Sequence, residues 1–181
     1  MNHNEIGGCM GHLAGAEGIT FCAAIRRLFD EHPPLRQQMD QMVLKAKQIT
    51  SGVEQDLGVA IRELAEMEKK FKSELEPHSE REEGGLFPVL GRHIGTQFGP
   101  IAVMEYEHGE AKRNLALFEE RMGEIGQSPA REQVQSVVSP LMTAIGILQE
   151  HFMKEENVLF PMAEKVLTEE EKEELLKLFD R

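Results

Sequence analysis

The stretch HFMKEENVLFP occupies residues 151–161, and the related stretch HSEREEGGLFP occupies residues 78–88. Both contain a histidine, two glutamates four and five residues later, and then Leu-Phe-Pro at the same offsets. Residues four apart lie on one face of a helix, so His78 with Glu82, and His151 with Glu155, can point toward a common centre. The repeat therefore predicts two related pairs of helices, with one His-x-x-x-Glu unit in each pair.

A shorter repeat relates His32 to His108. Each histidine follows a glutamate and lies seven residues after an isoleucine, Ile25 or Ile101. We expect each helix pair to contribute one such single histidine beside its His-x-x-x-Glu unit.

The apolar residues around these histidines keep the 3-4 spacing of amphipathic helices. Four such stripes cover residues 25–49, 57–86, 101–122 and 134–162, and turn-forming residues separate them at Ser51-Gly52, Gly91–Pro100 and Gly123–Pro129. Short connections make neighbouring helices antiparallel, so the predicted fold is all-α, an up-down-up-down four-helix bundle. The stretch TEEEKEELLKLF at 168–179 begins with an N-cap threonine and predicts a short C-terminal helix.

The domain organisation is predicted to be simple. Residues 1–18 are rich in glycine and aperiodic, which favours an irregular N-terminal arm, and residues 19–181 form one domain. Pro33 and Pro34 suit the first turn of a helix but would kink a helix that passes through them. We therefore predict a break or bend next to His32, with residues 20–31 as a separate short segment.

The composition argues against several classes of function. A net charge of −12 does not favour a nucleic-acid partner, which would require a basic face. We see neither a signal peptide nor a membrane span, because the longest uncharged stretch, Gln133–Gln149, is rich in polar residues. Cys9 and Cys22 do not make a disulfide framework. We expect a cytoplasmic protein.

Each of the four apolar stripes is interrupted by polar residues that can bind metals. They are His32, His78, Glu82, His108, His151 and Glu155. Burying unpaired imidazoles and carboxylates costs several kcal/mol each, and a bound cation would remove that cost. The turns also suit a shared site, because positions midway between successive histidines of the four helices fall at or near the turn-forming residues. The six residues are therefore predicted to hold metal.

The type of metal is less restricted by the sequence. Four imidazoles and two carboxylates without a thiolate suit iron, manganese or zinc. Two metals that share two bridging glutamates, with two histidines each, would use all six residues and leave open coordination positions for a small molecule.

Other residues of ligand type fall outside this pattern. Glu83 and Glu156 could orient ligating histidines, but each lies about 100° round the helix from the preceding glutamate, which favours a solvated face. Tyr106 lies about 200° round the helix from His108 and should point away from the centre. The remaining histidines are expected to be structural or exposed; they are His3, His12 and His93.

These motifs resemble the hemerythrin-type HHE cation-binding family over roughly residues 20–165. The matching pieces are LFDEHPPLR around His32, EYEHGEAKRNL around His108, and the two H-x-x-x-E-E-x-x-L-F-P stretches. The resemblance implies a four-helix bundle with a non-haem di-iron centre, bridged by glutamates and by an oxo or hydroxo group.

Within that family the pattern is more similar to bacterial repair-of-iron-centres proteins than to oxygen carriers. Oxygen carriers have a fifth histidine and an aspartate where this sequence has Lys112 and Glu156. The resemblance implies a stress-response protein that repairs, or supplies iron to, iron–sulfur clusters damaged by oxidation or nitric oxide. Iron–sulfur proteins and a diatomic ligand, O2 or NO, are then the expected partners.

Other functions stay open at this point. The same centre could bind or sense O2 or NO reversibly, and a di-iron oxidase or an iron store are further alternatives. The repair proteins commonly carry a separate N-terminal domain with a cysteine pair, where this sequence has the arm with Cys9. We interpret Cys9 as an incidental cysteine rather than a redox thiol.

Overall fold

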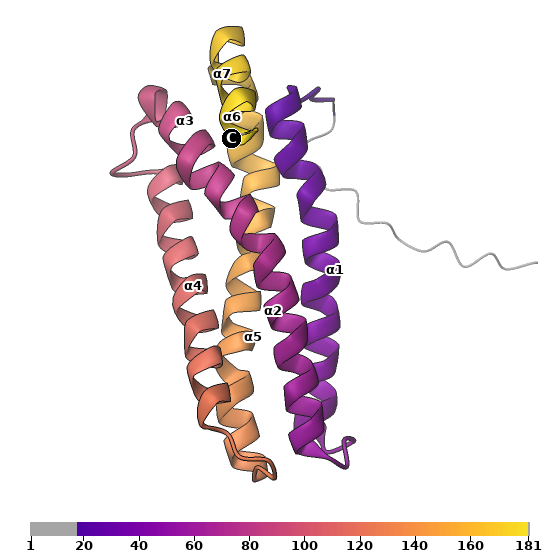
Figure 1. Ribbon diagram of the computed structural model, residues 1–181. Helices are drawn as coiled ribbons and strands as arrows, with labels where there is room; N and C mark the ends of the chain where they lie inside the picture. The colour runs from indigo at the N-terminus through magenta and orange to yellow at the C-terminus, as the bar shows by residue number, and fades with distance from the viewer. Residues whose placement is uncertain (1–17, 181) are drawn as a thin grey trace, which may run out of the picture.

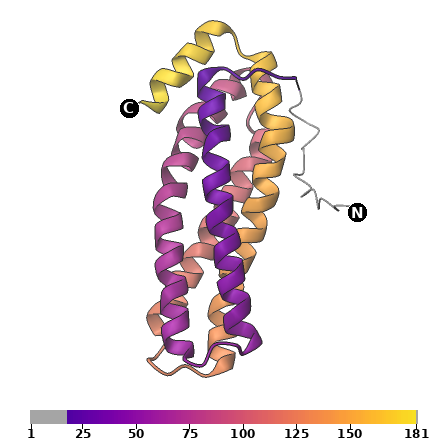
Figure 2. The same cartoon turned by 90° about the vertical axis from the view of Figure 1, so that its right-hand side faces the viewer.

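The computed structural model describes residues 18–180, and these residues form helices joined by short connections, with no strand among them (Figure 1). Four long helices make the body: α1 (Ala23–Ser51), α2 (Leu57–Arg81), α4 (Pro100–Glu124) and α5 (Arg131–Lys154). They run alternately down and up in Figure 1, and Figure 2 shows α1 between α2 and α5. The predicted all-α bundle is confirmed. No helix within residues 18–180 is both long enough and apolar enough to cross a membrane.

The first helix contradicts the predicted break next to His32. Helix α1 continues through Pro33 and Pro34 without interruption. Both prolines are exposed, while Leu28 and Leu35 are buried on either side of them. Proline inside a helix costs about 3 kcal/mol, but the buried stripe packs along the whole length of α1. Tertiary packing therefore outweighs the local cost.

A π-helical turn begins at the glutamate of each His-x-x-x-Glu unit. Helix α2 continues into η1 (Glu82–Leu86) and α3 (Phe87–Ile94), and α5 continues into η2 (Glu155–Leu159) and α6 (Phe160–Val166). The amides of Phe87 and Phe160 donate to the carbonyls of Glu82 and Glu155, five residues earlier. Each π turn thus begins at the first glutamate of the repeated stretch and ends at the leucine of Leu-Phe-Pro, whose proline has no N–H to donate to the helix.

Two apolar clusters fill the bundle, one above and one below the predicted ligands. The lower cluster includes Leu35, Leu75, Ala111 and Leu148. The upper cluster includes Leu28, Leu86, Met104, Leu159 and Phe179. On every long helix the predicted ligands lie between a residue of one cluster and a residue of the other.

The last helix, α7 (Glu169–Phe179), closes the upper end of the bundle (Figure 2). Thr168 accepts from the amide of Glu171, and the side chain of Glu171 accepts from the amide of Thr168. This capping box confirms the predicted start of the helix. Leu175 and Phe179 bury α7 against the upper cluster.

Candidate metal centre

All six predicted ligands meet at one level of the bundle and are buried. They form two groups, which share Glu82 and Glu155. The first group adds His32 and His78, and the second adds His108 and His151. In each group the candidate ligand atoms lie within 4.8 Å of one another. Two adjacent cations bridged by two carboxylates would need this arrangement.

The Nε2 atom of each histidine faces a shared carboxylate. The distances are 3.3 Å from His32 to Glu155, 3.4 Å from His78 to Glu82, 3.4 Å from His108 to Glu82 and 3.2 Å from His151 to Glu155. All four carboxylate oxygens of Glu82 and Glu155 are buried without a hydrogen-bond donor, as are the Nε2 atoms of His32 and His78. Buried polar atoms of this kind are costly unless they are paired. A bound cation would satisfy them.

The Nδ1 atom of each histidine contacts a second, outer carboxylate. The pairs are His32 with Glu156 at 2.7 Å, His78 with Glu31 at 2.9 Å, His108 with Glu83 at 2.6 Å and His151 with Glu107 at 3.1 Å. An ionised carboxylate can only accept, so Nδ1 donates, and in the neutral ring Nε2 then carries the lone pair that faces the centre. The outer carboxylates thus select the tautomer that could bind a metal.

These outer contacts connect the four helices in a closed ring. Each outer glutamate belongs to the element next to the helix that carries its histidine: α1 to α2, η1 to α4, α4 to α5, and η2 back to α1. Each outer carboxylate also pairs with a basic side chain, which belongs to the same helix as the histidine that the carboxylate contacts. The pairs are Glu156 with Arg36, Glu31 with Arg81, Glu83 with Lys112 and Glu107 with Lys154.

The His108 and His151 rings approach most closely, with their Nε2 atoms 2.9 Å apart. In neutral rings that donate from Nδ1, both Nε2 atoms carry lone pairs and cannot bond to each other. A cation between the two rings would remove this conflict. The donor set therefore suits a metal on this side as well.

Burial and neighbouring charges shift the pKa values of several groups in the centre. Burial alone would raise the pKa of Glu156, but hydrogen bonds from His32 and Arg36 outweigh it and hold that pKa below its ordinary value. Burial and the charge of Glu155 raise the pKa of Glu82. Burial opposes protonation of His151, yet the negative charge of Glu155 outweighs it and raises the pKa of His151 to about 9. A metal that binds this ring must therefore displace a proton.

Two sequence interpretations are corrected by the outer carboxylates. Glu156 is only 3% exposed, so the solvated face predicted for it was wrong. Glu83 is exposed, as predicted, but its side chain also contacts His108. The predicted angle of about 100° holds for an α-helix, whereas both glutamates lie in π turns, which are wider. Glu31 and Glu107 were not recognised as contacts of the centre. Their signal was the glutamate before each single histidine, which faces the histidine of the next helix.

Other predicted positions lie away from the centre. Tyr106 is exposed, as expected, and His93 pairs with Glu171 of α7. Cys22 is a free, half-buried cysteine before α1, where burial raises the pKa of its thiol. The remaining candidates lie outside the described residues; they are His3, Cys9 and His12.

Comparison with known proteins agrees with this geometry. The iron-sulfur cluster repair protein YtfE of Pectobacterium atrosepticum is 33% identical to the chain over 141 residues, which are 77% of this chain and 62% of that protein. The YtfE proteins of Citrobacter koseri and of Escherichia coli O1:K1 are each 32% identical over the same shares. The chain thus spans less than two thirds of the length of these relatives. No solved structure matches it significantly.

The family model of the hemerythrin HHE cation binding domain matches residues 23–163. This range contains all six predicted ligands and the four outer carboxylates. The chain therefore belongs to the hemerythrin HHE cation-binding domain family.

Proposed function

We propose that the protein holds two iron ions, one in each group of ligands, with Glu82 and Glu155 shared between them. The observation that supports this most directly is the set of buried, unpaired lone pairs on two overlapping groups. Imidazole and carboxylate donors without a thiolate suit iron. Each ion would have two imidazoles and the shared carboxylates, which leaves open coordination positions.

We further propose that the centre repairs damaged iron–sulfur clusters or supplies iron to them. The repair proteins from three bacteria, to which the chain is similar, support this role. Lys112 occupies the place of the oxygen carriers' fifth histidine, and its Nζ lies 2.6 Å from Glu83. It thus serves the outer ring and adds no imidazole to the centre. Bound iron would supply redox chemistry and exchangeable metal, while the chain's own histidines and outer carboxylates hold and orient it.

The number of metals is tested first. Protein purified with iron should contain about two irons per chain, and His78→Ala and His151→Ala variants should contain fewer. Iron well below two per chain that does not change in either variant would contradict the proposed centre. Measurement of iron, manganese and zinc in the same samples identifies the metal.

The repair role is tested with an iron–sulfur dehydratase whose cluster has been damaged by nitric oxide. Iron-loaded protein should restore the activity of the dehydratase, and metal-free protein should not. A free-iron control at the same concentration shows how much recovery needs no protein. If loaded protein gives no more recovery than this control, the repair role is wrong. A stable and reversible oxygen adduct would instead favour a role in binding O2.

A further inference from the structure

The two groups of the proposed centre differ in the cations that hold their outer carboxylates. In the His32/His78 group these cations are Arg36 and Arg81, whose side chains are 29% and 19% exposed. In the His108/His151 group they are Lys112 and Lys154, whose side chains are 56% and 40% exposed. Arginine holds a carboxylate with a planar fork, whereas lysine is a flexible and strongly hydrated point charge. The outer carboxylates of the His108/His151 group are therefore held by the more exposed and more flexible cations.

Aromatic rings also pack more closely on the histidines of the His32/His78 group than on those of the His108/His151 group. The ring of Phe152 stacks on His32 at 4.1 Å between centroids with planes 7° apart, and it meets His78 edge-on at 5.6 Å. Phe87 packs on His108 at 5.5 Å and at a tilt of 41°. Phe152 thus contacts both histidines of the first group closely, whereas its centroid lies 6.2 Å from that of His151.

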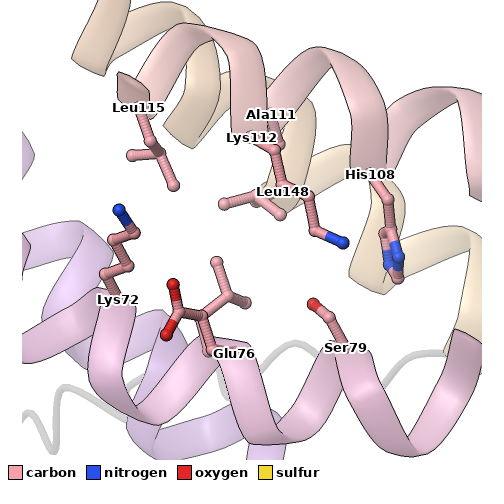
Figure 3. Close-up of a pocket in the computed structure, with 9 residues that line it drawn as sticks. Lys72, Glu76, Ser79, His108, Ala111, Lys112, Leu115 and Leu148 are labelled. Atoms are coloured by element: carbon pink, nitrogen blue, oxygen red, sulfur yellow. The ribbon is translucent and has the colours of Figure 1, made fainter. Parts of the chain in front are cut away.

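A cavity reaches only as far as the second group. It has a volume of about 240 Å³, lies between α2 and α4, and has His108 and Lys112 in its wall (Figure 3). Figure 3 shows Glu76 and Ser79 of α2 across from His108 and Lys112 of α4. Helices α2 and α4 contact each other far less than α4 and α5 do, which leaves this opening in the side of the bundle. None of the residues lining this cavity belongs to the His32/His78 pair.

We propose that the metal held by His108 and His151 is the exchangeable one, and that it enters and leaves through this cavity. The inference rests on the proposed two-metal centre. The ion passes the Glu83–Lys112 pair, where a small movement of the exposed lysine frees the outer carboxylate. Glu76 offers a second carboxylate at the exposed side of the cavity. The metal held by His32 and His78 has no such path, because neither histidine lines the cavity, and it is released more slowly.

The experiment measures iron release. Reduced, iron-loaded protein is mixed anaerobically with excess ferrozine, and the coloured iron–chelator complex is followed with time. We expect two phases of equal amplitude, one iron each, with rates that differ roughly tenfold or more, as expected when outer contacts to ligating histidines differ in strength. His108→Ala should lose the fast phase, and His32→Ala should lose the slow phase.

The path is tested by filling the cavity. Ala111→Phe places a ring inside it, and Glu76→Trp does so from an exposed position that does not threaten folding. Both variants should slow the fast phase and leave the slow phase unchanged. The matched control is Val103→Phe, which fills a separate hollow of about 290 Å³ beside Lys154 and should change neither phase.

Each contrary result overturns a defined part of the proposal. Simultaneous loss of both irons in one phase would show that the groups are equivalent. Slowing by Val103→Phe but not by the two cavity variants would place the path beside Lys154 instead. Fewer than two bound irons would contradict the proposed function rather than this inference. Release kinetics need no repair activity, so the two proposals can fail separately.

Discussion

At the scale of single residues, Glu156 connects a buried histidine to the outer face of the bundle. Its carboxylate lies 2.7 Å from His32 Nδ1 and 2.6 Å from an Arg36 nitrogen. Glu156→Gln keeps the shape but removes the charge that fixes the tautomer of His32. We expect the affinity for iron at the His32/His78 group to fall about 10- to 100-fold, the range found when outer partners of ligating histidines are removed.

Competition with a chelator of known affinity measures this change. Glu150→Gln is the matched control, because Glu150 is exposed and lies directly before His151 on the same helix. It should bind iron as the wild type does. Equal affinities in the two variants would show that the outer carboxylate does not support the histidine.

The sequence predicts the position of the six inner residues because each one interrupts a regular apolar stripe. It could not assign Glu31 and Glu107 to the centre, because they lie beside that stripe rather than in it. Their partners, His78 and His151, are on neighbouring helices. Which carboxylate reaches which ring depends on how the helices are rotated against each other, and periodicity within one helix does not contain that information.

At the scale of elements, the π turns place two successive glutamates against the centre. The periodicity of the sequence predicted the helices and the turns between them, but not these segments. A π turn adds one residue to a helical turn and so shifts the apolar stripe by one position. Leu-Phe-Pro consists of apolar residues, which fit the stripe with or without this shift, so the pattern does not reveal the π turn. The continuity of α1 could not be predicted from local sequence, because it depends on the packing of the buried stripe on both sides of Pro33 and Pro34.

Helix α7 packs on the first π turn, η1, at Gly85, whereas the neighbouring Gly84 faces open space and serves as a control. A Cβ atom added at Gly85 would lie 2.8 Å from Phe179 and 3.2 Å from Leu175, whereas one added at Gly84 meets nothing within 4 Å. Gly84→Ala should raise the free energy of unfolding by up to about 1 kcal/mol through helix propensity. Gly85→Ala should lower it by about 1–3 kcal/mol through overpacking under α7.

Urea denaturation of the metal-free proteins compares the two glycine variants. Proteolysis near the C-terminus would report directly whether α7 has left the bundle in Gly85→Ala. Similar stabilities in both variants would mean that α7 moves aside without cost, and that its packing on η1 contributes little.

At the scale of the whole molecule, a polar layer separates two apolar clusters. The ring of outer carboxylates joins all four long helices at this level, so the layer is also where the bundle is tied together. The layer contains two buried carboxylates with no hydrogen-bond donors. We expect these carboxylates to lower the free energy of unfolding of the metal-free protein, and to be useful only when they bind metal.

Replacing both shared carboxylates separates these two roles. The double variant Glu82→Met with Glu155→Met keeps the volume of the layer but removes its buried charges. Without metal we expect it to be at least as stable as the wild type, and up to about 4 kcal/mol more stable, as found when buried ionic groups are exchanged for apolar ones. Addition of iron should stabilise the wild type, because the folded state alone presents the site, and should leave the variant unchanged.

Urea denaturation with and without iron gives all four stabilities. Glu80→Met with Glu150→Met controls for the substitution itself, since both of those glutamates are exposed. A metal-free Glu82/Glu155 variant clearly less stable than the wild type would show that the carboxylates stabilise the bundle through the histidines alone. The polar layer would then be a structural ion-pair network, and its six residues would need no metal to account for their burial.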